Sequence, residues 1–268
     1  MEWFEAIILG LVQGLTEFLP VSSSGHLEIG KVLLGVEATD DLMFTTMVHA
    51  ATVLSTIVVF RKQILDLFKG LFKFKYNDQT DYVFKIALSC VPIMIVGLFF
   101  KEDVEALFGS IKVVGFALLL TSALLFFSDL ASKRDKVTNP ASESRNGISY
   151  LQAFVVGLGQ ALAVIPGLSR SGTTISTGLI CGVRRDVMAQ FSFLMVLIPI
   201  LGESFLELVG GEFSASSVGA LPLALGFLSA FVSGLFACKV MIALVKKAKL
   251  SWFAIYCLIA AAAIFIFA

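Results

Sequence analysis

The chain has 268 residues, of which 57% are hydrophobic and only 15% charged, and its mean hydropathy is +0.92. Soluble domains are closer to a quarter charged, and several apolar runs here approach the roughly 20 residues that a bilayer-spanning helix needs. The composition excludes an ordinary soluble domain and predicts an all-α polytopic membrane protein. The formal net charge is zero, so nothing indicates a nucleic-acid partner.

The first apolar segment, residues 2–19, stops at Pro20 and is followed by a Ser-rich break and a short apolar stretch to about Gly35. Neither half comfortably spans a bilayer alone, so we predict a broken, re-entrant helix pair. We expect no cleavable signal peptide, because the first 20 residues carry three glutamates and lack a basic start.

Better spanning candidates follow at residues 41–60, 84–100, 113–130, 187–209, 219–238 and 251–268. A second broken pair, about 150–165 and 170–182, lies between the third and fourth candidates. We expect one membrane domain over residues 1–268, with repeat one at 1–130, a polar linker at 131–149 and repeat two at 150–268. The four cysteines stand singly in apolar runs and predict neither a metal nor a disulfide site.

The two broken pairs are similar in sequence. At an offset of 147, identical residues recur: Gly10, Leu11, Gln13, Leu15, Ser22, Ser24 and Gly25 meet Gly157, Leu158, Gln160, Leu162, Ser169, Ser171 and Gly172. A second match, at an offset of 137, pairs Gly97-Leu98-Phe99 with Gly234-Leu235-Phe236. Repeats around interrupted helices are typical of transporters and place the site between the repeats.

Basic residues divide unevenly between the two faces that this arrangement defines. Fifteen Lys and Arg fall in the loops and turn of one face and three on the other. The positive-inside rule makes the first face cytoplasmic. The first broken pair then enters from outside and the second from the cytoplasm. This predicts an inverted repeat, whose polar breaks meet inside the membrane, where irregular backbone must be buried in protein or line a wet cavity.

Residues 166–174, with apolar sequence on both sides, hold one guanidinium, four hydroxyls and two glycines. Its Pro-Gly pair should stop the incoming helix near Ile165, and Ser169 can cap a new helix that begins at about Arg170. A helix start with hydroxyls and a fixed cation suits a phosphate. An Arg in apolar surroundings is costly and usually functional.

The first break carries the complementary groups. Gln13 and Glu17 are four residues apart and share a helix face, and the Glu17 carboxylate needs a partner, which Arg170 or a bound metal ion would supply. Ser23 and His26 are spaced so that hydroxyl and imidazole can approach. Phosphoryl transfer needs such an anion cradle, charge clamp, nucleophile and base. The absence of Walker and dinucleotide glycine motifs argues against a nucleotide enzyme.

At these two stretches, Gln13–His26 and Pro166–Thr174, the chain resembles the undecaprenyl diphosphate phosphatase family, the UppP or BacA type linked to bacitracin resistance. The layout matches over essentially the whole chain. The E/Q-x-x-x-E motif of that family falls on Gln13 and Glu17, and its PGxSRSxxT motif is intact.

Two departures from the family pattern stand out. Ser24 occupies a position where the family usually has Thr. Thr45 and His49 stand where a Glu and a Gln are often found in the first spanning helix. We expect His49 to pack or hydrogen-bond inside the bundle.

The resemblance implies hydrolysis of undecaprenyl diphosphate to the monophosphate and inorganic phosphate, which recycles the lipid carrier of cell-wall synthesis. It implies a divalent cation, magnesium or calcium, and a polyprenyl diphosphate lipid as substrate, met among membrane lipids. It also implies a place in the bacterial plasma (inner) membrane, with an active site that opens to the outer, periplasmic face. The sequence leaves the oligomeric state open, a homodimer included.

On this interpretation Arg170 clamps phosphate oxygens in a fork geometry that Lys does not reproduce. We expect Ser23 as nucleophile, with His26 as general base and then general acid. Glu17, with Gln13, orients His26 or holds the cation. A rival route has His26 or Glu17 activating water directly. The remaining expected substrate-binding residues are Ser22, Ser24, Ser169, Ser171, Thr173 and Thr174.

Two other classes of protein compete with this prediction. A transporter, such as a flippase for a prenyl phosphate, fits the repeats and interrupted helices equally well. A structural scaffold explains none of the buried ionisable residues. The Ser, His and Glu side chains beside the anion cradle favour chemistry, because binding alone needs no nucleophile and base.

Overall fold

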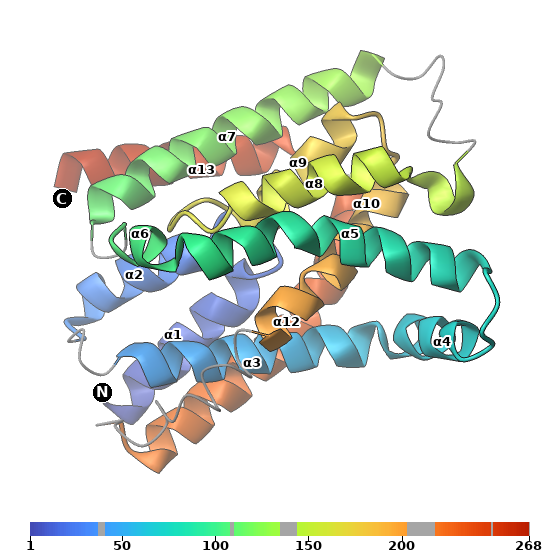
Figure 1. The fold of residues 1–268 in the computed structure, drawn as a ribbon. Helices are drawn as coiled ribbons and strands as arrows, with labels where there is room; N and C mark the ends of the chain where they lie inside the picture. The colour runs from blue at the N-terminus through green and yellow to red at the C-terminus, as the bar shows by residue number, and fades with distance from the viewer. Residues whose placement is uncertain (37–40, 108–109, 135–143, 203–217, 248, 268) are drawn as a thin grey trace.

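The computed structural model describes residues 1–36, 41–107, 110–134, 144–202, 218–247 and 249–267 (Figure 1). These residues form a bundle of helices and contain no strand. The prediction of an all-α protein is confirmed.

The first half of the chain contains α1 (Trp3–Thr16), α2 (Ser23–Leu34), α3 (Asp41–Val59), α4 (Arg61–Leu71), α5 (Asp78–Phe99), α6 (Lys101–Glu105) and α7 (Ile111–Arg134). A short 3-10 helix, Arg145–Gly147, opens the second half. It is followed by α8 (Tyr150–Leu162), α9 (Arg170–Ile180), α10 (Arg185–Met195), α12 (Ala220–Lys247) and α13 (Ser251–Phe267).

Four helical segments in the described residues are long and apolar enough to cross a membrane: α5, α7 to Ala131, α10 with its continuation to Gly202, and α12. A fifth span results only if α3 and α4, which are bent by 73° at their junction, count as one. Six spans are therefore not confirmed, because α13 is apolar but short and α3 qualifies only together with α4. Residues 203–209 of one predicted span, and 135–143 of the linker, lie outside the described residues.

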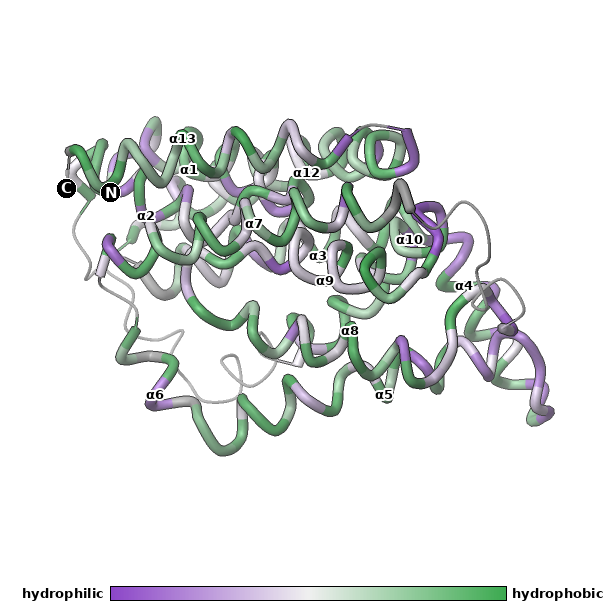
Figure 2. Tube along the Cα trace, turned by 90° about the horizontal axis from the view of Figure 1, so that it is seen from above, coloured by the Kyte–Doolittle hydropathy of each residue, from purple (hydrophilic) through white to green (hydrophobic). Residues whose placement is uncertain are grey.

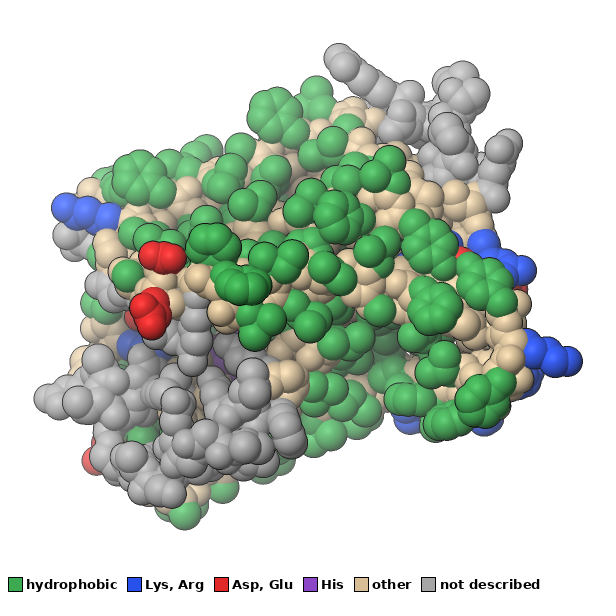
Figure 3. All heavy atoms as spheres, in the orientation of Figure 1, with side chains coloured by type: hydrophobic (Ala, Val, Ile, Leu, Met, Phe, Trp, Pro, Cys, Tyr) green, Lys and Arg blue, Asp and Glu red, His purple; other side chains and the backbone are tan. Residues whose placement is uncertain are grey.

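The outer surface of the bundle has the character of a membrane protein. Hydrophilic residues gather at α4 and at helix ends in Figure 2, and hydrophobic side chains cover the face shown in Figure 3, with Lys and Arg toward its two ends. Exposed apolar side chains on α5 and α7 include Phe84, Met94, Leu98, Phe99, Phe116, Phe126 and Phe127. An apolar surface of this extent is covered by lipid in a membrane protein.

The two broken helix pairs enter the bundle from opposite ends (Figure 1). Helix α1 begins, and α2 ends, at the end of the molecule that carries both chain termini, whereas α8 begins at the other end. Helix α1 packs on α12, and α8 packs on α5. The non-helical segments 17–22 and 163–169 therefore meet in the interior of the bundle.

Helix α1 approaches α12 closely because α1 has glycines on the facing side. A Cβ atom added at Gly14 would collide with the Ser233 Oγ and with the backbone at Ala230 of α12. Both contacts involve a fixed partner, since the Ser233 hydroxyl is held by its own bond to the Ser229 carbonyl, 2.7 Å long. This packing fixes the position of α1 and of the break that follows it.

Replacing Gly14 by Ala is expected to destabilise the protein by about 1–3 kcal/mol, the usual cost of forcing an extra methyl group into a packed interface. Gly97→Ala is the matched control, because a Cβ at Gly97 in α5 has no neighbour within 4 Å. That change should leave stability equal or slightly higher, since Ala favours helix over Gly. Thermal unfolding in detergent measures both; equal melting temperatures for the two variants would contradict the packing argument.

Candidate active site

The first break places a carboxylate directly after α1. Glu17 is the C-terminal cap of α1, and its backbone N–H still donates to the Gln13 carbonyl at 2.9 Å. The chain then turns through Pro20 to Ser22, which has a φ of 72° and whose hydroxyl caps α2 by accepting from the Gly25 N–H at 3.2 Å. The Glu17 side chain is thereby held at the polar break.

The second break places a guanidinium at a helix start. Ser169 caps α9 and accepts from the Gly172 N–H at 3.0 Å, which confirms the predicted cap and helix start at Arg170. Helix α8 ends at Leu162, three residues before the predicted stop, because a turn already begins there with the Ile165 N–H donating to the Leu162 carbonyl at 3.2 Å.

The two breaks are tied to each other by hydrogen bonds. The Ser171 hydroxyl donates to the Leu19 carbonyl at 3.1 Å, and the Gly167 N–H donates to the Ser24 hydroxyl at 3.4 Å. Each bond joins one hairpin to the other. Residues about 150 positions apart in sequence therefore share one site.

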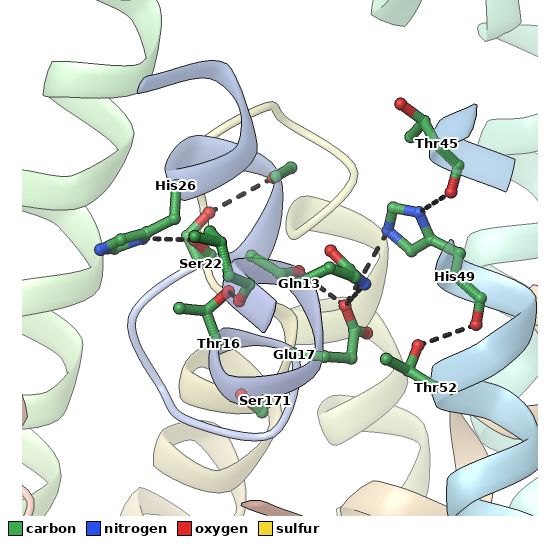
Figure 4. Close-up of polar contacts among 12 residues, drawn as sticks. Gln13, Thr16, Glu17, Ser22, His26, Thr45, His49, Thr52 and Ser171 are labelled. Carbon is green, nitrogen blue, oxygen red and sulfur yellow. Dashed lines mark hydrogen bonds and ion pairs between the residues drawn. The ribbon is translucent and has the colours of Figure 1, made fainter. Parts of the chain in front are cut away.

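Three groups surround the Glu17 carboxylate (Figure 4). Its Oε2 accepts hydrogen bonds from the Gln13 Nε2 at 2.8 Å and from the Ser23 Oγ at 2.6 Å. The His49 Nε2 of α3 lies 3.9 Å from the same oxygen. The Glu17 side chain is 12% exposed, so it is almost closed off from the surface. A carboxylate so close to a serine hydroxyl can accept its proton.

Glu17 and Arg170 line one cavity between the two breaks. The cavity is also lined by Ser171 and Thr174 of α9 and by polar groups of α3 and α10, namely Thr52, Thr56 and Ser192. The Nη1 of Arg170 is buried and has no hydrogen-bond partner among the described residues. Buried donors are nearly always satisfied, so this guanidinium is well suited to an anion that enters the cavity.

Of the predicted hydroxyls, those of Ser171 and Thr174 belong to residues that line the cavity, and most of the others make contacts within the two breaks. Ser22 and Ser24 are 3.3 Å apart between hydroxyl oxygens, and Ser169 and Ser171 are 3.4 Å apart in the same way. The Thr174 hydroxyl is 2.6 Å from that of Ser192. The hydroxyl of Thr173 is buried without a hydrogen-bond partner in the described part of the chain.

His26 lies apart from this group. Its Nδ1 is 2.7 Å from the Ser22 carbonyl, which can only accept, so Nδ1 carries the proton of a neutral ring. Its Nε2 is 2.7 Å from the Tyr256 hydroxyl of α13, and the two rings stack with centroids 5.5 Å apart. Figure 4 shows His26 on the side away from Glu17.

The structure thus brings together Gln13, Glu17 and Ser23 from one hairpin with Arg170 from the other. His26 does not join them, and its role as base stays a prediction. Two other participants were not predicted: His49, which was expected only to pack or hydrogen-bond in the bundle, and Tyr256.

The sequence contains a pattern from which the contribution of α3 to the site could have been predicted. Thr45, His49, Thr52 and Thr56 follow one another at spacings of four, three and four residues, which puts all four on one face of α3. A polar stripe on an otherwise apolar helix indicates a buried polar site. The partner of His26, Tyr256, has no such signal, because it lies 230 positions away.

This fold and site define a class of protein: an all-helical membrane protein with a carboxylate, a serine and a guanidinium gathered between two broken helix pairs. Residues 6–263 match the family described as bacitracin resistance protein BacA. The chain belongs to that family.

Close relatives agree with this assignment over nearly their whole length. An undecaprenyl-diphosphatase of Bacteroides fragilis is 56% identical over 97% of this chain and 96% of the relative. One from Parabacteroides distasonis is 57% identical over the same shares of the two chains. A more distant one, from Halothermothrix orenii, is 37% identical over 100% of this chain and 99% of the relative.

Proposed function

We propose that this protein is an undecaprenyl-diphosphatase, which hydrolyses undecaprenyl diphosphate to undecaprenyl phosphate and inorganic phosphate. The observation that carries the proposal is the cavity that Arg170 and Glu17 both line: the Nη1 of Arg170 has no hydrogen-bond partner among the described residues, and the Glu17 Oε2 accepts a hydrogen bond from the Ser23 hydroxyl. A buried cation and a serine next to a base are what phosphoryl transfer from an anionic substrate requires. The names of the relatives supply the substrate.

In the proposed reaction the Ser23 Oγ attacks the terminal phosphorus and its proton passes to the Glu17 Oε2. The bond from that phosphorus to the bridging oxygen breaks and undecaprenyl phosphate leaves. Glu17 passes that proton to the oxygen that leaves with undecaprenyl phosphate. Water then attacks the phosphoserine while Glu17 takes a proton from the water, and Glu17 returns this proton to the Ser23 Oγ as the bond from phosphorus to Oγ breaks and phosphate is released. Arg170 stabilises the charge on the phosphoryl oxygens.

Glu17 takes the part of base in this scheme because its oxygen lies 2.6 Å from the Ser23 hydroxyl, whereas both His26 nitrogens are engaged by Ser22 and Tyr256. The rival route, in which Glu17 activates water and Ser23 only donates a hydrogen bond, uses the same geometry. Both routes place the same carboxylate at the centre of the reaction.

We further propose the inverted repeat with six spans that the sequence predicts. A Cβ at Gly10 would meet Gly226 of α12, and a Cβ at Gly157 would meet Ser89 of α5. The two glycines are 147 positions apart and their two partners 137, which are the same two offsets that relate the halves of the sequence. Equivalent contacts in both halves support a common origin and a two-fold relation between them.

The charge distribution supports a bacterial inner-membrane location with the site facing outward. Helix α4 and the start of α8 lie at the end of the molecule opposite both termini (Figure 1). The segment 61–75, which contains α4 and the turn after it, carries the basic residues Arg61, Lys62, Lys69, Lys73 and Lys75. By the positive-inside rule this end is cytoplasmic. The hairpin α1–α2, which carries Glu17, then enters from the periplasmic side.

A divalent cation, magnesium or calcium, is part of the proposal. Among the described residues no three His, Cys, Asp or Glu side chains gather into a metal site, so oxygens of other kinds have to contribute. The Oε1 of Gln13 is buried and has no hydrogen-bond partner there, and it adjoins the Glu17 carboxylate through its own amide nitrogen. These two side chains would hold the cation, which would supply positive charge to neutralise the diphosphate.

Release of phosphate from undecaprenyl diphosphate by the purified protein in detergent is the expected result that tests this function. A hydrolase needs no sealed membrane, whereas a flippase gives no product without two compartments. Absence of phosphate release, together with movement of prenyl phosphate across liposome membranes, would favour the transporter instead.

A further inference from the structure

We infer that His49 is a third ligand of the cation held by Gln13 and Glu17, and that its imidazole makes the site prefer manganese to magnesium or calcium. The inference rests on the proposed function for the presence of a cation. It concerns a residue that the family motifs in the sequence did not assign to the site.

The orientation of the His49 ring is fixed by its backbone surroundings. Its Nδ1 is 2.8 Å from the Thr45 carbonyl, which can only accept, so Nδ1 carries a proton, and Nε2 is the nitrogen that can offer a lone pair to a metal ion. A backbone carbonyl that holds the far nitrogen in this way is the usual support of a metal-binding histidine. Nε2 faces the Glu17 carboxylate (Figure 4).

The distance between the two ligand atoms suits a single ion. The His49 Nε2 and the Glu17 Oε2 are 3.9 Å apart. Ligand atoms that are each about 2.1 Å from one ion lie at most about 4.2 Å from each other. The two atoms are too far apart for a direct hydrogen bond, so an ion between them would replace only their long charge contact.

The amide oxygen of Gln13, which has no hydrogen-bond partner in the described residues, is a second reason to infer a cation at this position. Gln13 is fully buried, and its Nε2 is engaged by Glu17, which leaves the Oε1 without a partner in the described residues. A buried acceptor without a partner costs about 1–3 kcal/mol. A cation shared with Glu17 and His49 would satisfy it. Figure 4 shows the three side chains close together, with the amide nitrogen of Gln13 toward Glu17.

The kind of ligands decides which cation is preferred. Magnesium and calcium favour oxygen ligands, whereas imidazole nitrogen suits transition metals. Gln13 and Glu17 supply oxygens and His49 supplies nitrogen, with water or phosphate oxygens left to complete the shell. Among divalent cations that accept such a mixed set, manganese also tolerates the octahedral oxygen-rich geometry that a diphosphate requires.

Electron paramagnetic resonance of free Mn²⁺ tests the inference without any activity measurement. The purified full chain in detergent should bind one Mn²⁺, and Ca²⁺ should displace it only in large excess. His49→Gln should weaken Mn²⁺ binding by about 10-fold or more. Mutation of a residue that only hydrogen-bonds to a metal ligand already lowers metal affinity by about that factor. Ca²⁺ should then compete at nearly equal concentration.

The matched control is His26→Gln, because the chain has only two histidines and the ring of His26 is engaged by Ser22 and Tyr256. Its Mn²⁺ affinity should equal that of the wild type. Equal affinity in His49→Gln and the wild type would overturn the inference, as would displacement by equimolar Ca²⁺ from the wild type, which needs no variant. Phosphate release is measured separately, so failure of the proposed function would be distinguishable from failure of this inference.

Discussion

Replacing Glu17 by Gln is expected to lower phosphate release by about 10²–10⁴-fold, the usual contribution of a general base. The Gln side chain has nearly the same shape and can still accept the hydrogen bond that Ser23 donates at 2.6 Å. It cannot take the proton, however, and it removes the only carboxylate that lines the cavity in the described part of the chain. Initial rates of phosphate release in detergent, at saturating substrate, measure the loss.

Glu102→Gln serves as the control for this experiment. Glu102 is an exposed residue of α6, so removal of its charge should leave the rate near that of the wild type. If Glu17→Gln retained the wild-type rate while His26→Gln lost it, the base would be His26, as the spacing of the sequence first indicated. The geometry around Glu17 would then serve only to hold the hairpin.

Replacing Arg170 by Lys is expected to lower turnover by about 10²–10³-fold, the size of effect seen when one preorganised donor to a developing charge is lost. Lys keeps the positive charge but loses the planar fork that binds two phosphate oxygens at once. The effect should fall mainly on kcat, because the charge on the phosphoryl oxygens is redistributed in the transition state.

Arg184→Lys is the matched control for the same chemical change. Arg184 is 56% exposed and pairs at the surface with Asp186 at 2.7 Å, so its replacement should alter neither turnover nor stability appreciably. Near wild-type turnover in Arg170→Lys would show that a point charge suffices. The clamp would then have to be assigned to backbone N–H groups at the start of α9.

The features that depend on local chemistry were predictable from the sequence. The Ser169 cap, the helix start at Arg170 and the break around Pro20 each follow from the preferences of one or two residues. The meeting of the two breaks was predicted from the repeat together with the distribution of positive charge. Those predictions needed no knowledge of side-chain packing.

The features that depend on distant partners were not predictable. The sequence predicted a span that ends at residue 60 and no helix directly after it, but residues 61–71 form α4, bent by 73° from α3. Ile64 and Leu67 of α4 pack against the core, whereas its Lys and Arg residues, Leu65 and Phe68 are exposed. His26 was expected beside Ser23, but the Tyr256 hydroxyl from the end of the chain holds its ring elsewhere. The spacing of residues in a single sequence reveals neither the core residues against which α4 packs nor the Tyr256 partner of His26.

The hydrogen bonds that join the two breaks have a consequence for how the protein folds during its synthesis. The acidic half of the site is synthesised first, and its cationic counterpart follows about 150 residues later. Until the Ser171 hydroxyl reaches the Leu19 carbonyl, the first hairpin holds a carboxylate in an apolar setting without its guanidinium. We expect an incompletely translated chain to leave that hairpin at the water interface, so that the enzyme acquires its buried charges only as a matched set.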